Sequence, residues 1–343
     1  MEGGRAVIID IHGHYTTAPA ALNAYRGRQM ALQNKPVRGS LSVTDDQLRA
    51  SLAGHLEQMD ARGIDALFFS PRASAMGHDV GDETISRHWT EINNDLIARV
   101  AGLYPGQFVP VAQLPQSPGA GLDGVLAELR RTVEELGFVG CLINPDVSGG
   151  LQPFTPSLGD RWWYPLWEAM VELDVPGMIH ASSTRNPALH LNGSHYIAQH
   201  YAAVVELCSS AVFTDFPTLR LIVPHGGGGI PFHFNRSRAL HVAESLPPFE
   251  DVVRNLYFDT AVYDADSLAM LVRKIGPDNV LFGSEMFGTA KTRDAVTGRF
   301  FDDILGDLDG LGLEQSDLTK ILSGNALRLF PRAAAHLGAA HVQ

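Results

Sequence analysis

The sequence predicts a (β/α)₈ barrel, an α/β fold in which eight parallel strands alternate with helices. Short apolar runs recur along the 343 residues, separated by longer amphipathic stretches. Most of these runs lack polar alternation, as expected for parallel strands that are covered on both faces. No internal repeat, low-complexity tract or linker-like stretch interrupts the pattern. We therefore expect a single domain over residues 1–343, with long loops around its active site.

Eight apolar runs are the candidate strands. In chain order they are Val7–Asp10, Ala66–Ser70, Val109–Ala112, Gly140–Ile143, Gly177–His180, Leu219–Val223, Leu256–Asp259 and Val280–Phe282. Helical patterns between them cover Thr44–Arg62, Ser86–Leu103, Leu122–Leu136, Trp162–Leu173, Tyr196–Val212 and Ser267–Ile275. The first of these helices begins with Thr44-Asp45-Asp46-Gln47, which has the form of a capping box. Long loops at Thr16–Val43 and Pro145–Asp160 follow the first and fourth strands, where loops usually shape the substrate site.

Composition and charge exclude several classes of protein. The chain has 38 acidic and 26 basic residues, a formal charge of −12, whereas nucleic-acid and anionic-membrane binders present basic surfaces. Its two cysteines are too few for a disulfide scaffold or a cysteine-based zinc module. No apolar run reaches the length of a membrane span, and Met1–Arg5 leads into the first strand without a signal-peptide pattern. We expect a cytoplasmic protein that binds neither nucleic acid nor membrane.

The sharpest local signal ends the first strand, in the sequence Ile9-Asp10-Ile11-His12-Gly13-His14. Residues i and i+2 of a strand point to the same face, so His12 and His14 can present their imidazoles together. Gly13 would keep the space between them free of a side chain. A bare His-x-His pair is more often structural, but this pair ends a barrel strand, where catalytic groups gather.

Three more polar residues are expected at the same end of the barrel. His180 ends the fifth strand, His225 follows the sixth, and Glu285 follows the eighth. Four histidines and a carboxylate at matching strand ends are hard to explain as core packing. Imidazole and carboxylate ligands suit Zn²⁺, or another divalent ion such as Mn²⁺. The glycines at Gly226–Gly229 would let the backbone approach a ligand closely.

Several side chains near these strand ends are candidates for binding substrate. Arg72 follows the second strand, where its guanidinium can hold a carboxylate in a bidentate fork. Arg236 and Arg238 follow the glycine run, where they could contact an anion or form salt bridges on the next helix. Tyr196 and Asn192, after the fifth strand, are candidate hydrogen-bonding groups.

The chain resembles the barrels of the amidohydrolase superfamily, and among them the bacterial 4-oxalomesaconate hydratases, over nearly its whole length. The matching stretches are long and unusual: IDIHGHYTTAP (9–19), FFSPRASAM (68–76), QLPQSP (113–118), ELGFVGCLINPD (135–146), DRWWYPLWEAMVELDVPGMIH (160–180), IVPHGGGGIPFH (222–233), YFDTAVY (257–263), LFGSEMFG (281–288) and GNALRLFPR (324–332). The resemblance implies one divalent metal ion, Zn²⁺ first and Mn²⁺ as the alternative. Its implied ligands are His12, His14, His180 and Glu285. His225 would then face the substrate or support the metal site.

The chain departs from the hydratase pattern in several loops. Asp264 stands where these hydratases have histidine, Lys291 where they have arginine, and His200 where they have an acid. All three positions are expected near the substrate, whereas the metal ligands are intact. The resemblance therefore defines the class of chemistry better than it defines the substrate.

The sequence thus predicts a metal-dependent hydratase, a lyase that adds water to a C=C bond of a polycarboxylate ring-cleavage product in aromatic degradation. Glu285 would take a proton from water, and His225 would act as the paired acid or stabilise an enolate oxygen. Arg72, Lys291 and the other binding candidates would hold the substrate. Two alternatives use the same barrel: a nonoxidative decarboxylase of an aromatic or dienoic acid, and a C–C or C–N hydrolase. Apart from this small molecule, the expected partner is a further copy of the chain, in a dimer or higher homo-oligomer.

Overall fold

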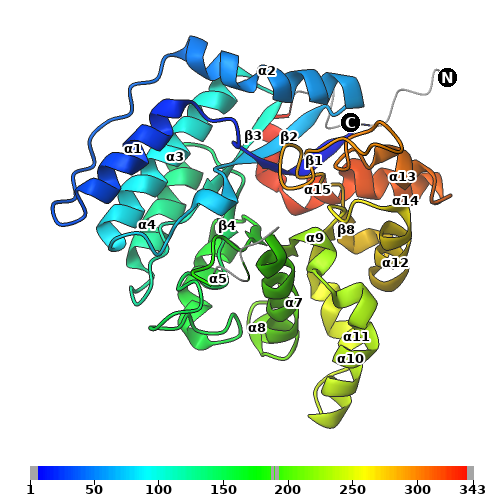
Figure 1. Cartoon of the computed structure of the whole chain (residues 1–343). Helices are drawn as coiled ribbons and strands as arrows, with labels where there is room; N and C mark the ends of the chain where they lie inside the picture. The colour runs from blue at the N-terminus through cyan, green and yellow to red at the C-terminus, as the bar shows by residue number, and fades with distance from the viewer. Residues whose placement is uncertain (1–6, 187–188, 190–192, 338–343) are drawn as a thin grey trace.

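The computed structural model describes residues 7–186, 189 and 193–337. Within them the predicted barrel is confirmed: eight parallel strands form one sheet in the order β1 to β8, with helices around it (Figure 1). The strands are β1 Ile9–His14, β2 Ala66–Ser70, β3 Phe108–Gln113, β4 Gly140–Ile143, β5 Gly177–Ile179, β6 Leu221–Val223, β7 Leu256–Asp259 and β8 Val280–Leu281. The amide of Ile11 donates to the carbonyl of Phe282 at 3.0 Å, which joins β1 to the segment after β8.

The helices lie outside the sheet. The longer ones are α1 Ala20–Ala31, α2 Asp45–Arg62, α3 Glu83–Leu103, α4 Asp123–Arg130, α5 Tyr164–Glu172, α7 Ser194–Cys208, α10 Ile230–Ala243 and α12 Ala265–Ile275. Short helices are α8 Val212–Asp215, α9 Pro224–Gly227, α11 Phe249–Val252, α13 Leu305–Asp309, α14 Gln315–Thr319 and α15 Asn325–Leu329. The predicted capping box begins α2: the Thr44 hydroxyl accepts from the Gln47 amide at 3.2 Å, and the Gln47 side chain accepts from the Thr44 amide at 2.9 Å.

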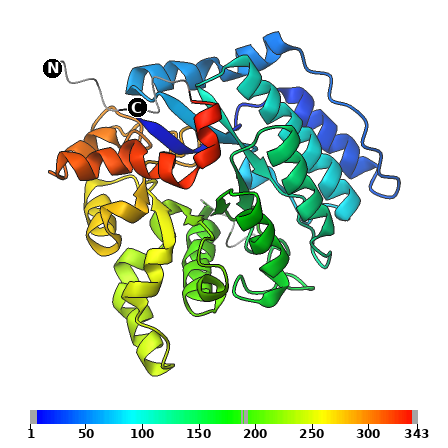
Figure 2. The same cartoon turned by 180° about the vertical axis from the view of Figure 1, so that it is seen from behind.

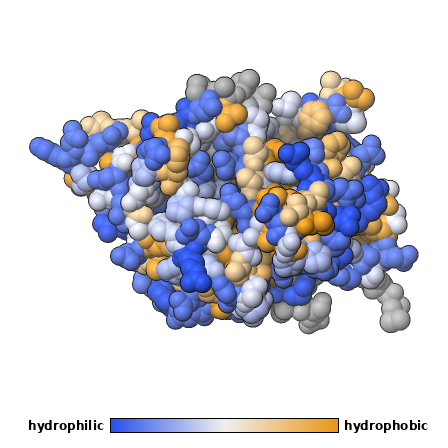
Figure 3. Space-filling view, turned by 90° about the horizontal axis from the view of Figure 1, so that it is seen from below, coloured by the Kyte–Doolittle hydropathy of each residue, from blue (hydrophilic) through white to orange (hydrophobic). Residues whose placement is uncertain are grey.

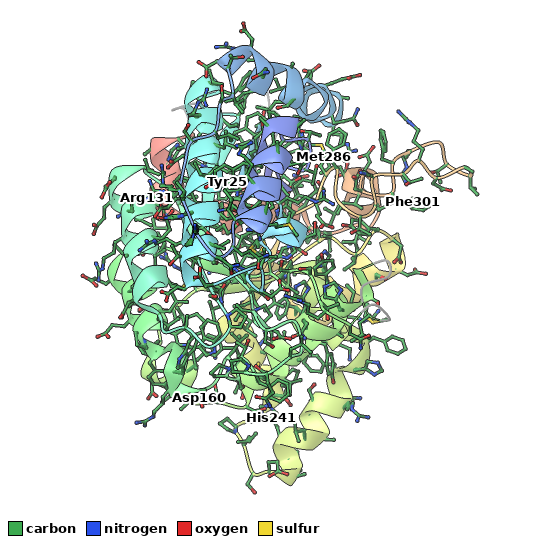
Figure 4. The ribbon with its side chains drawn as sticks, turned by 60° about the vertical axis from the view of Figure 1, so that its left-hand side comes forward. Tyr25, Arg131, Asp160, His241, Met286 and Phe301 are labelled. Carbon is green, nitrogen blue, oxygen red and sulfur yellow. The ribbon has the colours of Figure 1, made fainter. Side chains whose placement is uncertain are left out.

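The prediction of a continuous loop over Thr16–Val43 is wrong, because α1 forms inside it. Leu22, Tyr25 and Gln29 are buried on one face of this helix. The Tyr25 ring stacks on Trp89 of α3 with 6.3 Å between ring centroids, and Figure 4 shows Tyr25 on α1. The spacing of these residues is the helical signal that the sequence contained. The loop predicted at Pro145–Asp160 contains no helix or strand.

A bulge in β1 decides which of its side chains face the barrel interior. The pairing of β1 with β2 shifts its register between Asp10 and Gly13. Ile11 belongs to the inner apolar core, yet the next residue, His12, joins the polar cluster at the carboxyl end of the strands. A regular strand would place two consecutive side chains on opposite faces. The bulge therefore lets one strand supply both core and site.

The inner core is closed at the amino ends of the strands by the C-terminal segment. Phe330 meets Phe68 of β2 edge to face, with 4.7 Å between ring centroids. It also lies against Gly140, the first residue of β4, where a Cβ would come within 3.0 Å of the Phe330 ring. Figure 2 shows this red C-terminal part of the chain beside the blue β1. The carboxyl ends of the strands are thus left for the functional site.

An outer core packs between the sheet and the helices. It includes Trp163 and Trp167, both fully buried. On the face seen from below in Figure 3, hydrophilic and apolar residues are mixed. Among the described residues, no helix is both long and apolar enough to cross a bilayer.

Replacing Phe330 by Ala should lower the free energy of unfolding by about 3–5 kcal/mol, because it leaves a cavity where the inner core is closed. Chemical denaturation measures this change. Phe232→Ala is the matched control, since the Phe232 side chain is 75% exposed and its loss should change stability by less than about 0.5 kcal/mol. Equal stability of the two variants would contradict the role given to Phe330.

Candidate metal centre and active-site cavity

Three imidazoles and a carboxylate meet at the carboxyl end of the barrel. The Nε2 atom of His12 lies 3.1 Å from that of His14 and 3.2 Å from that of His180. The Nε2 atoms of His14 and His180 also lie 3.1 Å apart. A carboxylate oxygen of Glu285 completes the group, in which all ligand atoms lie within 4.8 Å of one another. All four side chains are buried.

The geometry of this group fits a divalent metal ion. Zn–N bonds are about 2.0–2.1 Å long, so nitrogen ligands of a tetrahedral ion stand roughly 3.3–3.4 Å apart. The three Nε2 separations come close to this value. Three neutral imidazoles and one carboxylate also form a donor set that Zn²⁺ and Mn²⁺ both accept. His12, His14, His180 and Glu285 can therefore hold one divalent cation.

The orientation of His12 is fixed by an acidic residue that sequence reasoning did not single out. Its Nδ1 atom lies 2.6 Å from Oδ2 of Asp259, at the end of β7. The other oxygen of Asp259 accepts from the backbone amides of Gly226 at 3.3 Å and Ala261 at 3.2 Å. A carboxylate can only accept here, so the proton sits on Nδ1 and the Nε2 lone pair of His12 faces the centre.

The other two imidazoles are held in the same way. His14 places its Nδ1 atom 2.7 Å from the Ser70 hydroxyl, which itself donates to backbone carbonyls and so accepts from the ring. His180 places its Nδ1 atom 2.8 Å from the carbonyl oxygen of Ala181. In each case the proton is on Nδ1 and the lone pair of Nε2 is directed into the cluster.

Burial sets the protonation of these rings. It lowers the pKa of His14 to about 3, helped by the charge of the neighbouring His12. It also lowers the pKa of His180 well below the ordinary value, and the adjacent imidazoles add to this. Burial, the largest single influence, acts in the same direction on His12, but the hydrogen bond to Asp259 and the charges of the nearby carboxylates together raise its pKa.

Glu285 is held through one of its two oxygens. The Tyr263 hydroxyl donates to Oε2 at 2.8 Å, and Nε2 of His225 lies 3.3 Å from the same atom. Within the described part of the chain, no hydrogen bond reaches Oε1. Burial raises the pKa of Glu285, but the hydrogen bond from His225 and the charges of the surrounding imidazoles lower it well below the ordinary value. Burial and the Glu285 charge raise the pKa of Tyr263, which keeps its hydroxyl protonated as a donor.

His225 occupies a strained backbone position and contacts a second histidine. Its φ of 54° is in the left-handed region, which costs a non-glycine residue about 1–3 kcal/mol. Its Nδ1 atom lies 3.1 Å from Nδ1 of His200, and the two rings are nearly parallel. Sequence reasoning placed His200 near the substrate, but it lies fully buried behind His225. Burial lowers the pKa of His200 well below its ordinary value.

A cavity of about 330 Å³ lies beside the cluster. Its lining joins members of the cluster to predicted substrate-binding residues, which are His14, His180, Glu285, Arg72, Tyr196 and Lys291. Nε of Arg72 donates to the Ser74 hydroxyl at 2.7 Å, and no described carboxylate pairs with Arg72 or Lys291. Burial and the charge of Glu285 raise the pKa of Tyr196 to about 12. The loop at Pro145–Asp160, expected to shape this site, contributes no residue to the cavity lining.

Other predicted binding residues lie elsewhere. Arg238, on α10, forms a salt bridge with Glu250 at 3.1 Å, and neither it nor Arg236 lines the cavity. Asp264 accepts from the amide of Ser267 at 2.9 Å and caps α12, and it is absent from the cavity lining. Asn192 lies outside the described residues.

The glycines of two motifs have structural reasons that sequence reasoning missed. A Cβ on Gly13 would lie 2.6 Å from a side-chain carbon of Leu67, because the residue between two inward-facing neighbours points the other way. It does not clear the space between His12 and His14. In the run after β6, a Cβ on Gly228 would lie 2.4 Å from the carbonyl oxygen of Ile197. Close approach to α7, together with positive φ, explains this glycine without a ligand.

Comparison with known proteins places this geometry in a family. A family model described as amidohydrolase matches residues 9–332. The chain belongs to the amidohydrolases. Its match covers every strand of the barrel and all members of the metal-binding cluster.

Two hydratases resemble this amidohydrolase over nearly its whole length. It is 44% identical over 337 residues to the 2-keto-4-carboxy-3-hexenedioate hydratase of Sphingobium sp. strain SYK-6, covering 97% of this chain and 98% of that protein. The crystal structure of 4-oxalomesaconate hydratase from Rhodopseudomonas palustris matches with a TM-score of 0.88 at 40% identity, covering 97% and 98% of the two chains. A manganese-containing dihydroxybenzoic acid decarboxylase from Polaromonas sp. JS666 shares the barrel, with a TM-score of 0.69, 21% identity and coverage of 95% and 96%.

In this amidohydrolase, His180→Ala should abolish stoichiometric binding of a divalent metal, because one of three convergent nitrogens is lost. Elemental analysis of the purified protein measures the metal content. Asp259→Asn should bind metal about 10–100-fold more weakly, since the ring of His12 loses its carboxylate partner.

The matched control is His241→Ala. His241 is equally buried but lies near the end of α10, where Figure 4 labels it, and its Nδ1 atom meets the carbonyl of Pro247. This variant should keep the wild-type metal content. Full metal content in His180→Ala would disprove the ligand assignment.

Proposed function

We propose that this amidohydrolase is a metal-dependent hydratase that adds water to a C=C bond of a polycarboxylate formed by aromatic ring cleavage. The observation that carries the proposal is a cavity that joins a metal-binding cluster to two cations without carboxylate partners among the described residues. The similarity to two hydratases over 97% of the chain supports the same reaction. A substrate of the kind named for those relatives, 2-keto-4-carboxy-3-hexenedioate or 4-oxalomesaconate, has carboxylates for both cations.

His12, His14, His180 and Glu285 would hold the metal ion, Zn²⁺ in our proposal. When bound, such an ion supplies a positive charge that stabilises negative charge developing on a substrate oxygen. The three neutral imidazoles add no charge and Glu285 is the only anion in the ligand set, so half of the charge of a divalent ion stays uncompensated. This donor set would thereby stabilise the negative charge that develops as water adds to the C=C bond.

Arg72 and Lys291 would bind the substrate carboxylates. Among the described residues, the two terminal nitrogens of Arg72 have no protein partner, so the fork that suits a carboxylate is available. Lys291 adds a second, point-like charge from the loop after β8. Tyr196, whose raised pKa keeps it protonated, can donate a hydrogen bond in the same cavity. These contacts would orient the alkene toward the cluster.

Glu285 would take a proton from the attacking water. Its Oε2 atom is already held by Tyr263 and His225, which fixes the orientation of the carboxylate. A carboxylate fixed beside the cavity supports the role of a general base, which has to lie within hydrogen-bond reach of the water. The water oxygen would then bond to one alkene carbon, and the proton taken up by Glu285 would be returned to the other carbon, so that one water is consumed per turnover.

The decisive experiment is product analysis with metal-loaded enzyme and an oxalomesaconate-type substrate. We expect a product heavier by one water, with loss of the absorbance of the conjugated alkene. Release of CO₂ without water addition would replace the hydratase by the decarboxylase alternative. Hydrolytic cleavage of the substrate would favour the alternative of a C–C or C–N hydrolase.

Glu285→Gln should lower kcat by about 100-fold or more even at saturating metal, because an amide cannot accept the proton from water at neutral pH. Steady-state kinetics with measured metal content separates loss of the base from loss of the ion. Glu57→Gln, an exposed carboxylate on α2, should retain full turnover. Near-native turnover of metal-saturated Glu285→Gln would exclude Glu285 as the base.

Arg72→Ala should reduce kcat/KM by about 10–100-fold, the range expected when a charged hydrogen bond worth about 1.5–3 kcal/mol is lost. Arg72→Lys keeps the charge but not the fork, so it should recover only part of this loss. Arg49→Ala, with a half-exposed guanidinium on α2, serves as the control. An unchanged kcat/KM in Arg72→Ala would remove Arg72 from the binding site.

The cytoplasmic location and the homo-oligomer stay predictions. Cell fractionation tests the first. Light scattering of the purified, metal-loaded chain tests the second, for which we expect a mass of at least two chains.

A further inference from the structure

A short series of hydrogen bonds links the backbone next to one metal ligand to the side chain of another. The amide of Ala181, the residue after His180, donates to Nε2 of His200 at 3.2 Å. Nδ1 of His200 and Nδ1 of His225 lie 3.1 Å apart. Nε2 of His225 then lies 3.3 Å from Oε2 of Glu285.

The fixed donor at one end of this series determines where every proton lies. A backbone amide can only donate, so Nε2 of His200 accepts and carries no proton. The proton of His200 is therefore on Nδ1, facing His225. Two N–H groups cannot face each other at 3.1 Å, so Nδ1 of His225 accepts. The remaining proton of His225 must be on Nε2, directed at Glu285.

We propose that His200 is a positioning residue that fixes His225 as a neutral hydrogen-bond donor with its proton on Nε2. His200 does not line the cavity, and its ring meets that of His180 only edge to face, with 5.6 Å between centroids. Through its hydrogen bond it acts on His225, and so on the Glu285 carboxylate. With the Tyr263 hydroxyl, this donor holds Oε2 of Glu285 and leaves Oε1 for the cluster.

This arrangement decides between the two roles that the sequence left open for His225. A general acid must face the substrate, but His225 is absent from the cavity lining and its Nε2 faces Glu285. The series behind it ends at a peptide N–H, which does not supply a proton. His225 therefore keeps its proton and acts as a fixed dipole. A neutral imidazole that donates in this way stabilises negative charge on a neighbouring oxygen.

The backbone gives the same residues a second connection. Ala181 donates to His200 through its backbone N–H and accepts from Nδ1 of His180 through its carbonyl. The two peptide groups that flank this one residue thus help orient a metal ligand and the donor that faces another ligand. His225 holds its left-handed φ of 54° between these contacts and the glycines that follow it.

The inference rests on the proposed function only for the choice of substrate. Its first test therefore uses no substrate. Protein labelled with ¹⁵N-histidine and loaded with diamagnetic Zn²⁺ is studied by long-range ¹H–¹⁵N correlation spectroscopy, with His225→Gln identifying the signals of that ring. We expect the pattern of a neutral ring protonated at Nε2. A ring protonated at Nδ1, or at both nitrogens, would overturn the proposal, whatever reaction the enzyme catalyses.

The second test uses turnover with measured metal content. His200→Leu removes both contacts and should lower kcat by about 10–100-fold, with full metal content and a KM within about threefold of wild type. His200→Asn keeps an N–H close to the position of Nδ1 and should recover kcat to within about fivefold. His241→Leu, which removes a buried imidazole outside the series, controls for loss of packing.

Wild-type kcat in His200→Leu, or equal losses in the Leu and Asn variants, would show that His200 serves packing alone. If no variant and no wild-type sample hydrates the substrate, the proposed function fails, while the spectroscopic result still decides the role of His200.

Discussion

The convergence of three imidazole nitrogens on one point is the constraint on which the site depends. Lone pairs about 3.1 Å apart repel one another, and at most one proton could bridge any two of them. The arrangement is held because each ring is anchored on its opposite nitrogen. The anchors are Asp259 at the end of β7, Ser70 at the end of β2 and the carbonyl of Ala181 after β5. Three separate parts of the barrel must therefore be in register before a cation can bind.

The backbone of the barrel is locally strained where it brings these groups together. β1 contains a bulge, and the residues that follow β6 and β8, His225 and Glu285, both have left-handed backbones, with φ of 54° and 51°. Such positions cost about 1–3 kcal/mol each for non-glycine residues. The strain lies in the segments that carry the site, whereas the closed end of the barrel is filled by apolar side chains around Phe330. Stability and function are thus divided between the two ends of the strands.

The sequence predicted what depends on local pattern, and it missed what depends on neighbours across the barrel. Apolar runs located all eight strands, and the i, i+2 spacing brought His12 and His14 together because alternation is a property of one strand. Asp259 was missed because its partner is 247 residues away, and only the closed barrel brings it to His12. For Arg238 the sequence left two alternatives open, because a position after a strand does not specify whether a side chain turns toward the cavity or toward a partner such as Glu250.

The electrostatics of the cavity explain how a chain with a formal charge of −12 can take an anionic substrate. Many surface carboxylates are already paired with arginines, as Asp95 is with Arg38 and Arg131. Arg72 and Lys291, by contrast, have no described carboxylate partner and face the same cavity as the cluster. Exposed charges farther away than about 8–10 Å are screened by salt, so the charges that line the cavity dominate there. In the proposed function, selection of a polycarboxylate would therefore depend on these two side chains and the cation, and the acidic remainder of the surface would not prevent it.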